Sequence, residues 1–188
     1  MNMRKELEES IDEMVEELKK REREQDELLR LTRQLVRECA NAIKSIHARD
    51  RESAKRHIAK ADELVEKVKA LDENFERISS QALQEYVEVK VLDALVNGKE
   101  LPTYKKLEVP FTVYLTGLCD VIGELRREML ESLKEGKKED AKKYFELIND
   151  IYDSMLPLRF SNSLLPNFRR KQDVARSQVE HARSELLR

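Results

Sequence analysis

Apolar residues recur at alternating steps of three and four along most of the chain, which is the spacing of an amphipathic α-helix. The first such stripe predicts one helix over residues 3–48. Its members are Leu7, Ile11, Met14, Leu18, Leu28, Leu31, Leu35, Cys39, Ala42 and Ile46. Arg21 and Gln25 interrupt the stripe. We therefore expect residues 1–27 either to project from the body or to contact another subunit.

A second run of the same period predicts helical structure over residues 51–96. Asp72-Glu73-Asn74 is a candidate break within it. Asn97-Gly98 has the residue types that end helices, and Leu101-Pro102-Thr103 is expected to be a connector.

The second half of the chain predicts three more helices. Pro110 fits the first turn of one that ends near Glu135-Gly136. The next covers residues 138–156, and the last begins after Pro166. Four Gly, four Pro and no Trp leave little material for turns or strands. The predicted fold class is all-α, a bundle of long antiparallel helices in one domain spanning residues 1–188.

Composition and charge exclude several classes of protein. The formal net charge of −2 gives no overall attraction to nucleic acid. No apolar run approaches the ~20 residues of a membrane span, and no secretory signal is recognisable. Cys39 and Cys119 fall on apolar helical faces, as expected for core thiols in a reducing compartment. We therefore expect a cytoplasmic protein that has no membrane partner.

Four carboxylates stand out from this background. Glu85 and Glu88 are three residues apart, and Asp120 and Glu124 are four apart, so each pair shares one helical face. Both pairs lie among apolar residues, where an unpaired carboxylate becomes neutral or finds a cation. Two inward pairs on two helices would form an oxygen-rich site suited to Mg²⁺ or Mn²⁺.

An alternative interpretation of these carboxylates is that they are solvated or ion-paired. With 39% of the residues charged, most acidic side chains have such surroundings. Lys90, Arg126 and Arg127 are near enough in sequence to be their partners. The apolar stripe around Glu85, and the repetition of the pattern on a second helix, favour the metal site.

A basic ridge lies opposite the apolar stripe of the first helix. It spans a sector of about 60°, at ~100° per residue, and consists of Arg30, Arg33, Arg37, Lys44 and Arg51, with His47 at the stripe's edge. A stripe of Lys and Arg alone is more often an ordinary solvated face. Between residues 28 and 49, however, the only acidic residue is Glu38, and this lack of acidic partners favours a binding surface. Such a surface can follow a phosphate backbone. The predicted RNA-binding residues are Arg30, Arg33, Arg37, Lys44 and His47. Arg77 and Arg169-Arg170-Lys171 are the second choice.

The carboxylate segments are fairly specific for one family. Gln84-Glu85-Tyr86-Val87-Glu88 together with Gly117-Leu118-Cys119-Asp120-Val121-Ile122-Gly123-Glu124-Leu125 resembles the translin family, in particular its nuclease member, translin-associated factor X. Residues 31–47 are similar to the family's first helix and residues 168–180 to its last. The chain has only residues 98–103 where animal members carry a long connector, and in this it looks like the archaeal type.

The resemblance implies a function and a set of site residues. Factor X members cleave RNA with a divalent metal and four acidic residues, which correspond here to Glu85, Glu88, Asp120 and Glu124. Family members assemble as closed octameric shells, and the archaeal type would build the shell from one kind of chain. The resemblance therefore implies a homo-oligomer, an octamer.

Three functional hypotheses result. The first is a Mg²⁺- or Mn²⁺-dependent endoribonuclease that cleaves single-stranded or unpaired RNA. The second is a translin-like protein that binds RNA or single-stranded DNA without cleaving it. The third is a structural helical partner whose carboxylates form ion pairs. The three histidines lie on separate stretches, which gives Ser/His/Asp catalysis little support. No E-x-x-H repeat of a di-iron bundle is present.

Overall fold

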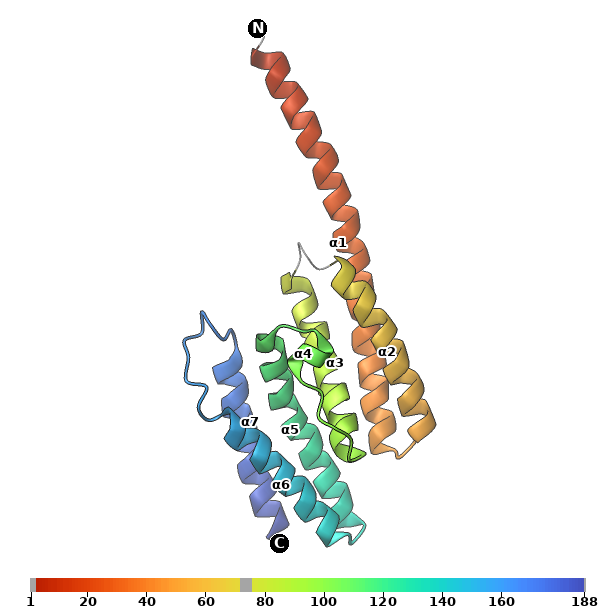
Figure 1. Ribbon diagram of the computed structural model, residues 1–188, viewed down its shortest axis with the longest axis vertical. Helices are drawn as coiled ribbons and strands as arrows, with labels where there is room; N and C mark the ends of the chain where they lie inside the picture. Colours follow the sequence, from red (N-terminus) through yellow and green to blue (C-terminus); the bar gives the residue numbers. More distant parts are fainter. Residues whose placement is uncertain (1–2, 72–75, 188) are drawn as a thin grey trace.

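The computed structural model describes residues 3–71 and 76–187, with side chains described up to residue 71 and from residue 78 (Figure 1). Within these ranges the chain forms seven helices and no strand. They are α1 (Met3–His47), α2 (Arg51–Leu71), α3 (Glu76–Val96), α4 (Tyr104–Leu107), α5 (Phe111–Lys134), α6 (Lys138–Met155) and α7 (Phe168–Leu186). The predicted all-α fold is confirmed.

Helix boundaries follow the sequence signals closely. α1 and α6 each end one residue before the predicted boundary, and Pro110 is the N-cap residue of α5. Gly98, just beyond α3, has a positive φ of 62°, as helix-terminating glycines commonly do. The candidate break at Asp72-Glu73-Asn74 lies outside the described residues.

The short helix α4 was not predicted; it follows directly after the expected connector Leu101-Pro102-Thr103. Thr103 caps it: the Thr103 hydroxyl accepts a hydrogen bond from the Lys106 backbone N–H at 3.3 Å. Leu107 and Val109 are buried and anchor this segment to the body.

The helices pack in pairs. α1 and α2 form one antiparallel hairpin and α5 and α6 another, while α3 packs between α1 and α5 (Figure 1). The segment after α3 crosses back over the bundle, so α5 runs in the same direction as α3 (Figure 1). α7 also runs parallel to α5, because Lys171 contacts Asp120 whereas Glu185, near the other end of α7, contacts Arg126. The predicted antiparallel packing is therefore found in the α1–α2 and α5–α6 hairpins, whereas α3, α5 and α7 run parallel to one another.

The core is continuous and apolar. Its largest fully buried side chains include Leu28, Leu35, Leu92, Ile122, Leu125, Met129 and Ile148. Cys39 and Cys119 are free thiols within it, as predicted. Burial raises the pKa of Cys119 to about 12, so this thiol stays protonated.

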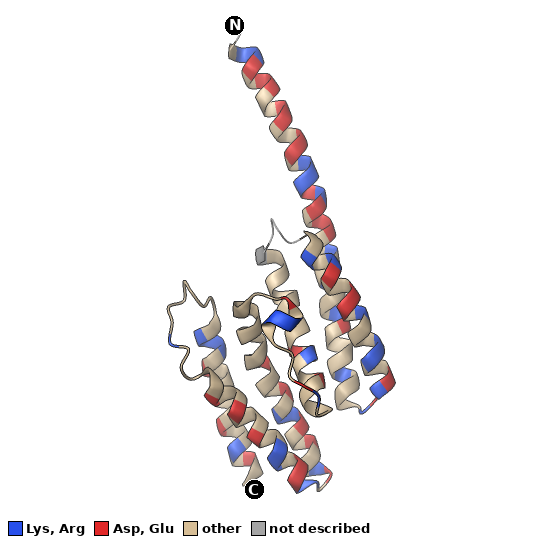
Figure 2. Cartoon of the chain, viewed as in Figure 1, with Lys and Arg blue, Asp and Glu red and all other residues tan. Residues whose placement is uncertain are grey.

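The N-terminal part of α1 extends beyond the bundle as a single helix (Figure 1). We call residues 3–27 the arm. Its apolar residues are exposed, with Leu7 at 60% and Leu18 at 62%. Acidic residues outnumber basic ones on the arm (Figure 2). No helix in the described ranges is long and apolar enough to cross a membrane.

Candidate functional site

Close packing of α3 against α5 sets the position of the carboxylates. A Cβ on Gly117 would lie 2.7 Å from Val87 Cγ1 and 3.2 Å from the backbone oxygen of Gln84. Val87 stands between Glu85 and Glu88, and Gly117 is one turn before Asp120. A glycine at this point lets the two carboxylate-bearing helices approach each other.

The four predicted carboxylates share one electrostatic neighbourhood. Glu88 is only 7% exposed, and burial, followed by the charges of Glu85, Asp120 and Glu124, raises its pKa to about 9. Burial is also the largest cause that raises the pKa of Glu85, followed by the charge of Asp120. The structure therefore brings the four residues together at the interface of α3 and α5.

Two of the four carboxylates contact basic side chains. The Lys171 ammonium, from α7, donates to both oxygens of Asp120 at 2.6 Å, and the Gln84 amide donates to one of them at 2.6 Å. His47 contacts Glu124. No hydrogen bond or ion pair with another described side chain is found for Glu85 or Glu88.

The three basic residues that the sequence suggested as ion-pair partners of the four carboxylates do not contact them. Lys90 pairs with Asp62 at 3.0 Å. Arg126 binds Glu185 and the Gln178 side chain on α7. Arg127 is exposed and forms no ion pair with a described residue. These three cations therefore do not neutralise the carboxylate cluster.

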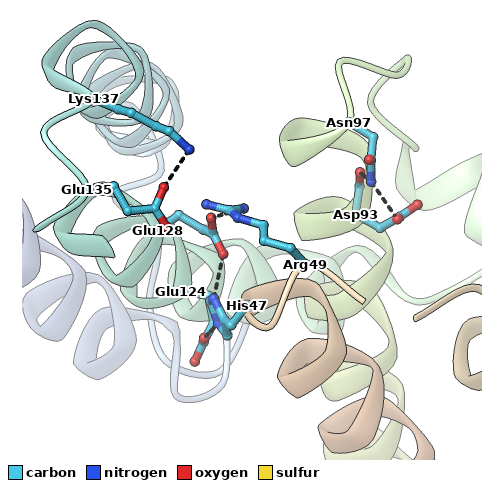
Figure 3. A network of polar contacts seen from close by, with 8 residues as sticks. All are labelled: His47, Arg49, Asp93, Asn97, Glu124, Glu128, Glu135 and Lys137. Atoms are coloured by element: carbon cyan, nitrogen blue, oxygen red, sulfur yellow. Dashed lines mark hydrogen bonds and ion pairs between the residues drawn. The ribbon is translucent and has the colours of Figure 1, made fainter. Parts of the chain in front are cut away.

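His47 lies within the cluster rather than on the basic ridge with which the sequence grouped it. Its side chain is only 4% exposed, with Nε2 2.5 Å from Glu124 Oε2 and Nδ1 2.6 Å from Glu128 Oε1 (Figure 3). Burial alone would lower the pKa of His47, but the hydrogen bonds to both glutamates outweigh it and raise the pKa. As placed here, the ring is not available for direct contact with an RNA backbone.

Sequence reasoning missed Glu128 and Gln84, and it placed Lys171 in a different role. Glu128 follows Glu124 by four residues, so the same spacing rule that paired Asp120 with Glu124 would have placed it on that face. Lys171 carried no local signal, because it reaches Asp120 from α7, 51 residues along the chain.

The residues present fit a hard divalent cation, although their side chains are not arranged around one. In the described part of the chain, no group of three or more His, Cys, Asp or Glu side chains stands ready to hold a metal. Lys171 and His47 instead contact Asp120 and Glu124. Half-buried Glu85 and buried Glu88 remain as oxygen donors without a cation, and carboxylate oxygens are the donors that Mg²⁺ and Mn²⁺ prefer.

The basic ridge is exposed on α1. Arg33, Arg37 and Lys44 face solvent and pair with no described acidic residue, while Arg30 pairs with Glu27 at 2.6 Å. Glu38 is turned toward α2, where it contacts His57 at 2.7 Å. The side chain of Arg77, a second-choice RNA contact, lies outside the described residues.

Fold and site together define a class: an all-helical bundle with four clustered carboxylates between its central helices and a basic ridge on its first. The chain belongs to the translin family, whose family model matches residues 5–184. An uncharacterised protein of Methanocaldococcus jannaschii is 32% identical over 168 residues, which cover 86% of this chain and 74% of that protein.

Solved structures of similar proteins agree with this assignment. AfC3PO in complex with duplex RNA is 32% identical, with a TM-score of 0.88 over 95% of each chain. A crystal structure of AfC3PO alone is 33% identical, with a TM-score of 0.83 over 97% of this chain and 95% of that one. NeC3PO without ligand is 25% identical, with a TM-score of 0.87 over 94% and 95%.

Proposed function

We propose that this protein is an endoribonuclease that depends on Mg²⁺ or Mn²⁺ held by Glu85, Glu88, Asp120 and Glu124. The proposal rests mainly on the environment of the Glu88 carboxyl. Its carboxyl is buried, has no cationic partner among the described residues, and has a pKa raised to about 9 by burial and by three other carboxylates. A divalent cation would relieve this repulsion and supply the missing partner.

Such an ion would supply two things when bound: polarisation of the scissile phosphate and a bound water of lowered pKa. The chain's own residues prepare the site. Glu85 and Glu88 offer oxygens from α3. Gln84 orients Asp120 on α5, and Lys171 occupies both of its oxygens when no metal is bound. The Lys171 ammonium also keeps a positive charge beside the carboxylates, which lowers the repulsion that an incoming phosphate would meet.

RNA is the proposed substrate, in single-stranded or unpaired form as the family resemblance implies. One similar structure, AfC3PO, is described as a complex with duplex RNA. The exposed cations Arg33, Arg37 and Lys44 give this chain a surface for phosphate contacts, which are largely independent of sequence. The same contacts would accept single-stranded DNA. The two free core thiols suit a reducing compartment such as the cytoplasm.

Assembly into a homo-oligomeric shell, an octamer by resemblance, is part of the proposal. The arm supports it, because its apolar stripe is covered by nothing in the described chain. Apolar residues arranged at heptad spacing on a solvent-exposed helix are typical of helices that pack against another chain.

A non-catalytic RNA-binding protein is the second candidate. It is favoured by one observation: Lys171 and His47 already contact two of the four carboxylates. Basic side chains in these positions could keep the cluster free of metal, and the ridge would then bind RNA without cleavage.

Metal dependence distinguishes the two candidates. Wild type, Glu88→Gln and the control Glu131→Gln are incubated with labelled single-stranded RNA in Mn²⁺, Mg²⁺ or EDTA. Glu131 lies on α5, as Asp120 and Glu124 do, but its ion pair is with the exposed Lys134. We expect wild type and Glu131→Gln to cleave with metal and not in EDTA, and Glu88→Gln to bind RNA without cleaving it. RNA binding by wild type without cleavage under any of these conditions would support the second candidate.

A further inference from the structure

Glu128 is the most deeply buried charged side chain in the described chain. It is 0% exposed and lies four residues after Glu124 on the same face of α5. A buried carboxylate needs partners, and Glu128 has two: His47 at 2.6 Å and Arg49, whose Nη1 is 2.5 Å from Oε2. The Arg49 contact is a close ion pair without a well-aligned N–H···O hydrogen bond.

The His47 ring lies between the two glutamates of this helical face. Nδ1 contacts Glu128 and Nε2 contacts Glu124 (Figure 3). The contact with Glu128 therefore orients the ring so that Nε2 points at Glu124. The four residues form a continuous line from Arg49 through Glu128 and His47 to Glu124. Partners of this kind, one contact removed from a reacting group, set its orientation.

Arg49 occupies a position that the backbone would assign to glycine. It follows the end of α1 with φ at 59°, and its amide hydrogen-bonds the Ile46 carbonyl at 3.0 Å, as at a left-handed helix terminus. Glycine is favoured there because it has no Cβ. An arginine at this point places a guanidinium against buried Glu128, which a glycine could not do.

We infer that Glu128 and Arg49 are positioning residues, which hold His47 so that His47 holds the Glu124 carboxylate toward the other three acidic residues. The inference rests on the proposed function, because it assigns these residues to the same site. Neither residue needs to touch RNA or metal. Their effect is on where the Glu124 oxygens lie.

Glu128→Gln tests the inference with little change in shape. The amide keeps the size of the side chain but loses the charge that binds both partners. We expect kcat to fall about 10- to 100-fold with an unchanged KM for RNA, and Mn²⁺ affinity measured by calorimetry to weaken about tenfold. Glu131→Gln, one turn further along α5 and outside this line, should leave all three quantities unchanged.

Substitutions at Arg49 show whether this residue positions Glu128 or only ends α1. Arg49→Gly relieves the backbone but removes the guanidinium, so kcat and Mn²⁺ affinity should fall as in Glu128→Gln. Arg49→Lys keeps a cation and should recover most of the wild-type kcat. If Arg49→Gly instead retains the wild-type kcat and Mn²⁺ affinity, the arginine serves only to end the helix, and its assignment is overturned.

The result for Glu128 can be told apart from a failure of the proposed function. If wild type cleaves or binds Mn²⁺ and Glu128→Gln does so equally well, the positioning role is overturned while the nuclease proposal stands. If wild type neither cleaves nor binds Mn²⁺, the nuclease proposal fails. Positioning is then decided by a metal-free crystal structure of Glu128→Gln. A rotated Glu124 side chain supports the role, and an unchanged His47 and Glu124 overturn it.

Discussion

Gly117 on α5 and Val87 on α3 are in such close contact that no side chain fits between them. A Cβ built on Gly117 would lie 2.7 Å from Val87 Cγ1 and 2.9 Å from Val87 Cβ, inside the closest approach of real side chains. Val87 lies between two of the acidic residues, and Gly117 is one turn before a third. The separation between the two helices is therefore set at the carboxylate cluster itself.

Gly117→Ala should force α3 and α5 apart. Overpacking of this kind costs about 1–3 kcal/mol of unfolding free energy, and it should also weaken Mn²⁺ binding because the carboxylates separate. Gly123→Ala is the matched control on the same helix, since a Cβ there meets nothing within 4 Å. That variant should be neutral or more stable by about 0.5–1 kcal/mol. Urea unfolding and Mn²⁺ calorimetry check both; equal stability of the two variants would contradict the packing argument.

Glu88 should make the metal-free protein less stable at high pH. Its folded pKa is raised from the usual 4.5 to about 9, by burial first and then by the other carboxylates. A raised pKa means that the folded state holds a proton which the unfolded state releases. The contribution of Glu88 to stability is thus full below pH 4.5 and is lost as pH rises toward 9.

The measurement is urea unfolding in EDTA at several pH values between 5 and 9. The unfolding free energy of wild type should decrease across this range, by up to ~1.4 kcal/mol per pH unit for each such proton. Glu88→Gln has no proton to lose at this position and should show a shallower decrease. Parallel pH profiles for the two proteins would rule out Glu88 as the responsible group.

Lys171 should compete with the metal for Asp120. Its ammonium is 2.6 Å from both Asp120 oxygens. Lys171→Met removes this charge, so Mn²⁺ affinity should increase up to about fivefold, the equivalent of ~1 kcal/mol for a partly exposed pair. The metal-free melting temperature should decrease, because the cluster becomes more negative. Lys142→Met, at an exposed pair on α6, is the control. Weaker Mn²⁺ binding by Lys171→Met would show that Lys171 supports the metal rather than opposing it.

The basic ridge should govern the salt dependence of RNA affinity. Arg33→Ala/Arg37→Ala removes two exposed cations and should reduce the slope of log affinity against log salt by about 1.4, at ~0.7 per contact with a single strand. Mn²⁺ affinity should not change, since the carboxylates lie on α3 and α5. Lys142→Ala/Lys143→Ala removes the same charge from α6 as a control. An unchanged salt slope would show that the ridge is only a solvated face. Arg169 and Arg170 would then be the next candidates for RNA binding.

The arm should control assembly. Ile11→Glu/Met14→Glu places charges in its exposed apolar stripe and should convert the oligomer to a smaller species in light scattering. Glu9→Gln/Glu13→Gln, on the opposite face of the arm, should leave the mass unchanged. A wild-type mass of 22.1 kDa, that of one chain, at micromolar concentration would contradict the assembly proposal.

The sequence predicted the helices well because apolar periodicity and helix-ending residues are local signals. It also indicated Glu85, Glu88, Asp120 and Glu124, since spacing places each pair on one face and apolar neighbours imply burial. The short helix α4 escaped detection because four residues are too few to show a period. Its N-cap residue, Thr103, cannot be told apart in the sequence from a threonine in a connector.

Contacts between distant segments were beyond this reasoning. His47 was placed with the ridge because its angle on α1 lies at the boundary between the two faces. Only the packing of both α1 and α5 against α3 brings its ring to Glu124 and Glu128. Lys171 could be recognised as a cation but not assigned to Asp120. That pairing depends on α7 running parallel to α5, which no local pattern encodes.

The two parts of α1 differ in what stabilises them. Residues 28–47 carry its buried side chains, whereas the arm has no neighbours within the described chain. Most of the stability of a protein helix comes from the packing of its apolar face, so lasting protection of the arm's backbone amides from hydrogen exchange should come from whatever covers its stripe. Protection of residues 28–47 should follow folding, and protection of the arm should follow protein concentration. The amides of a single helix would thus report separately on the fold and on the assembly.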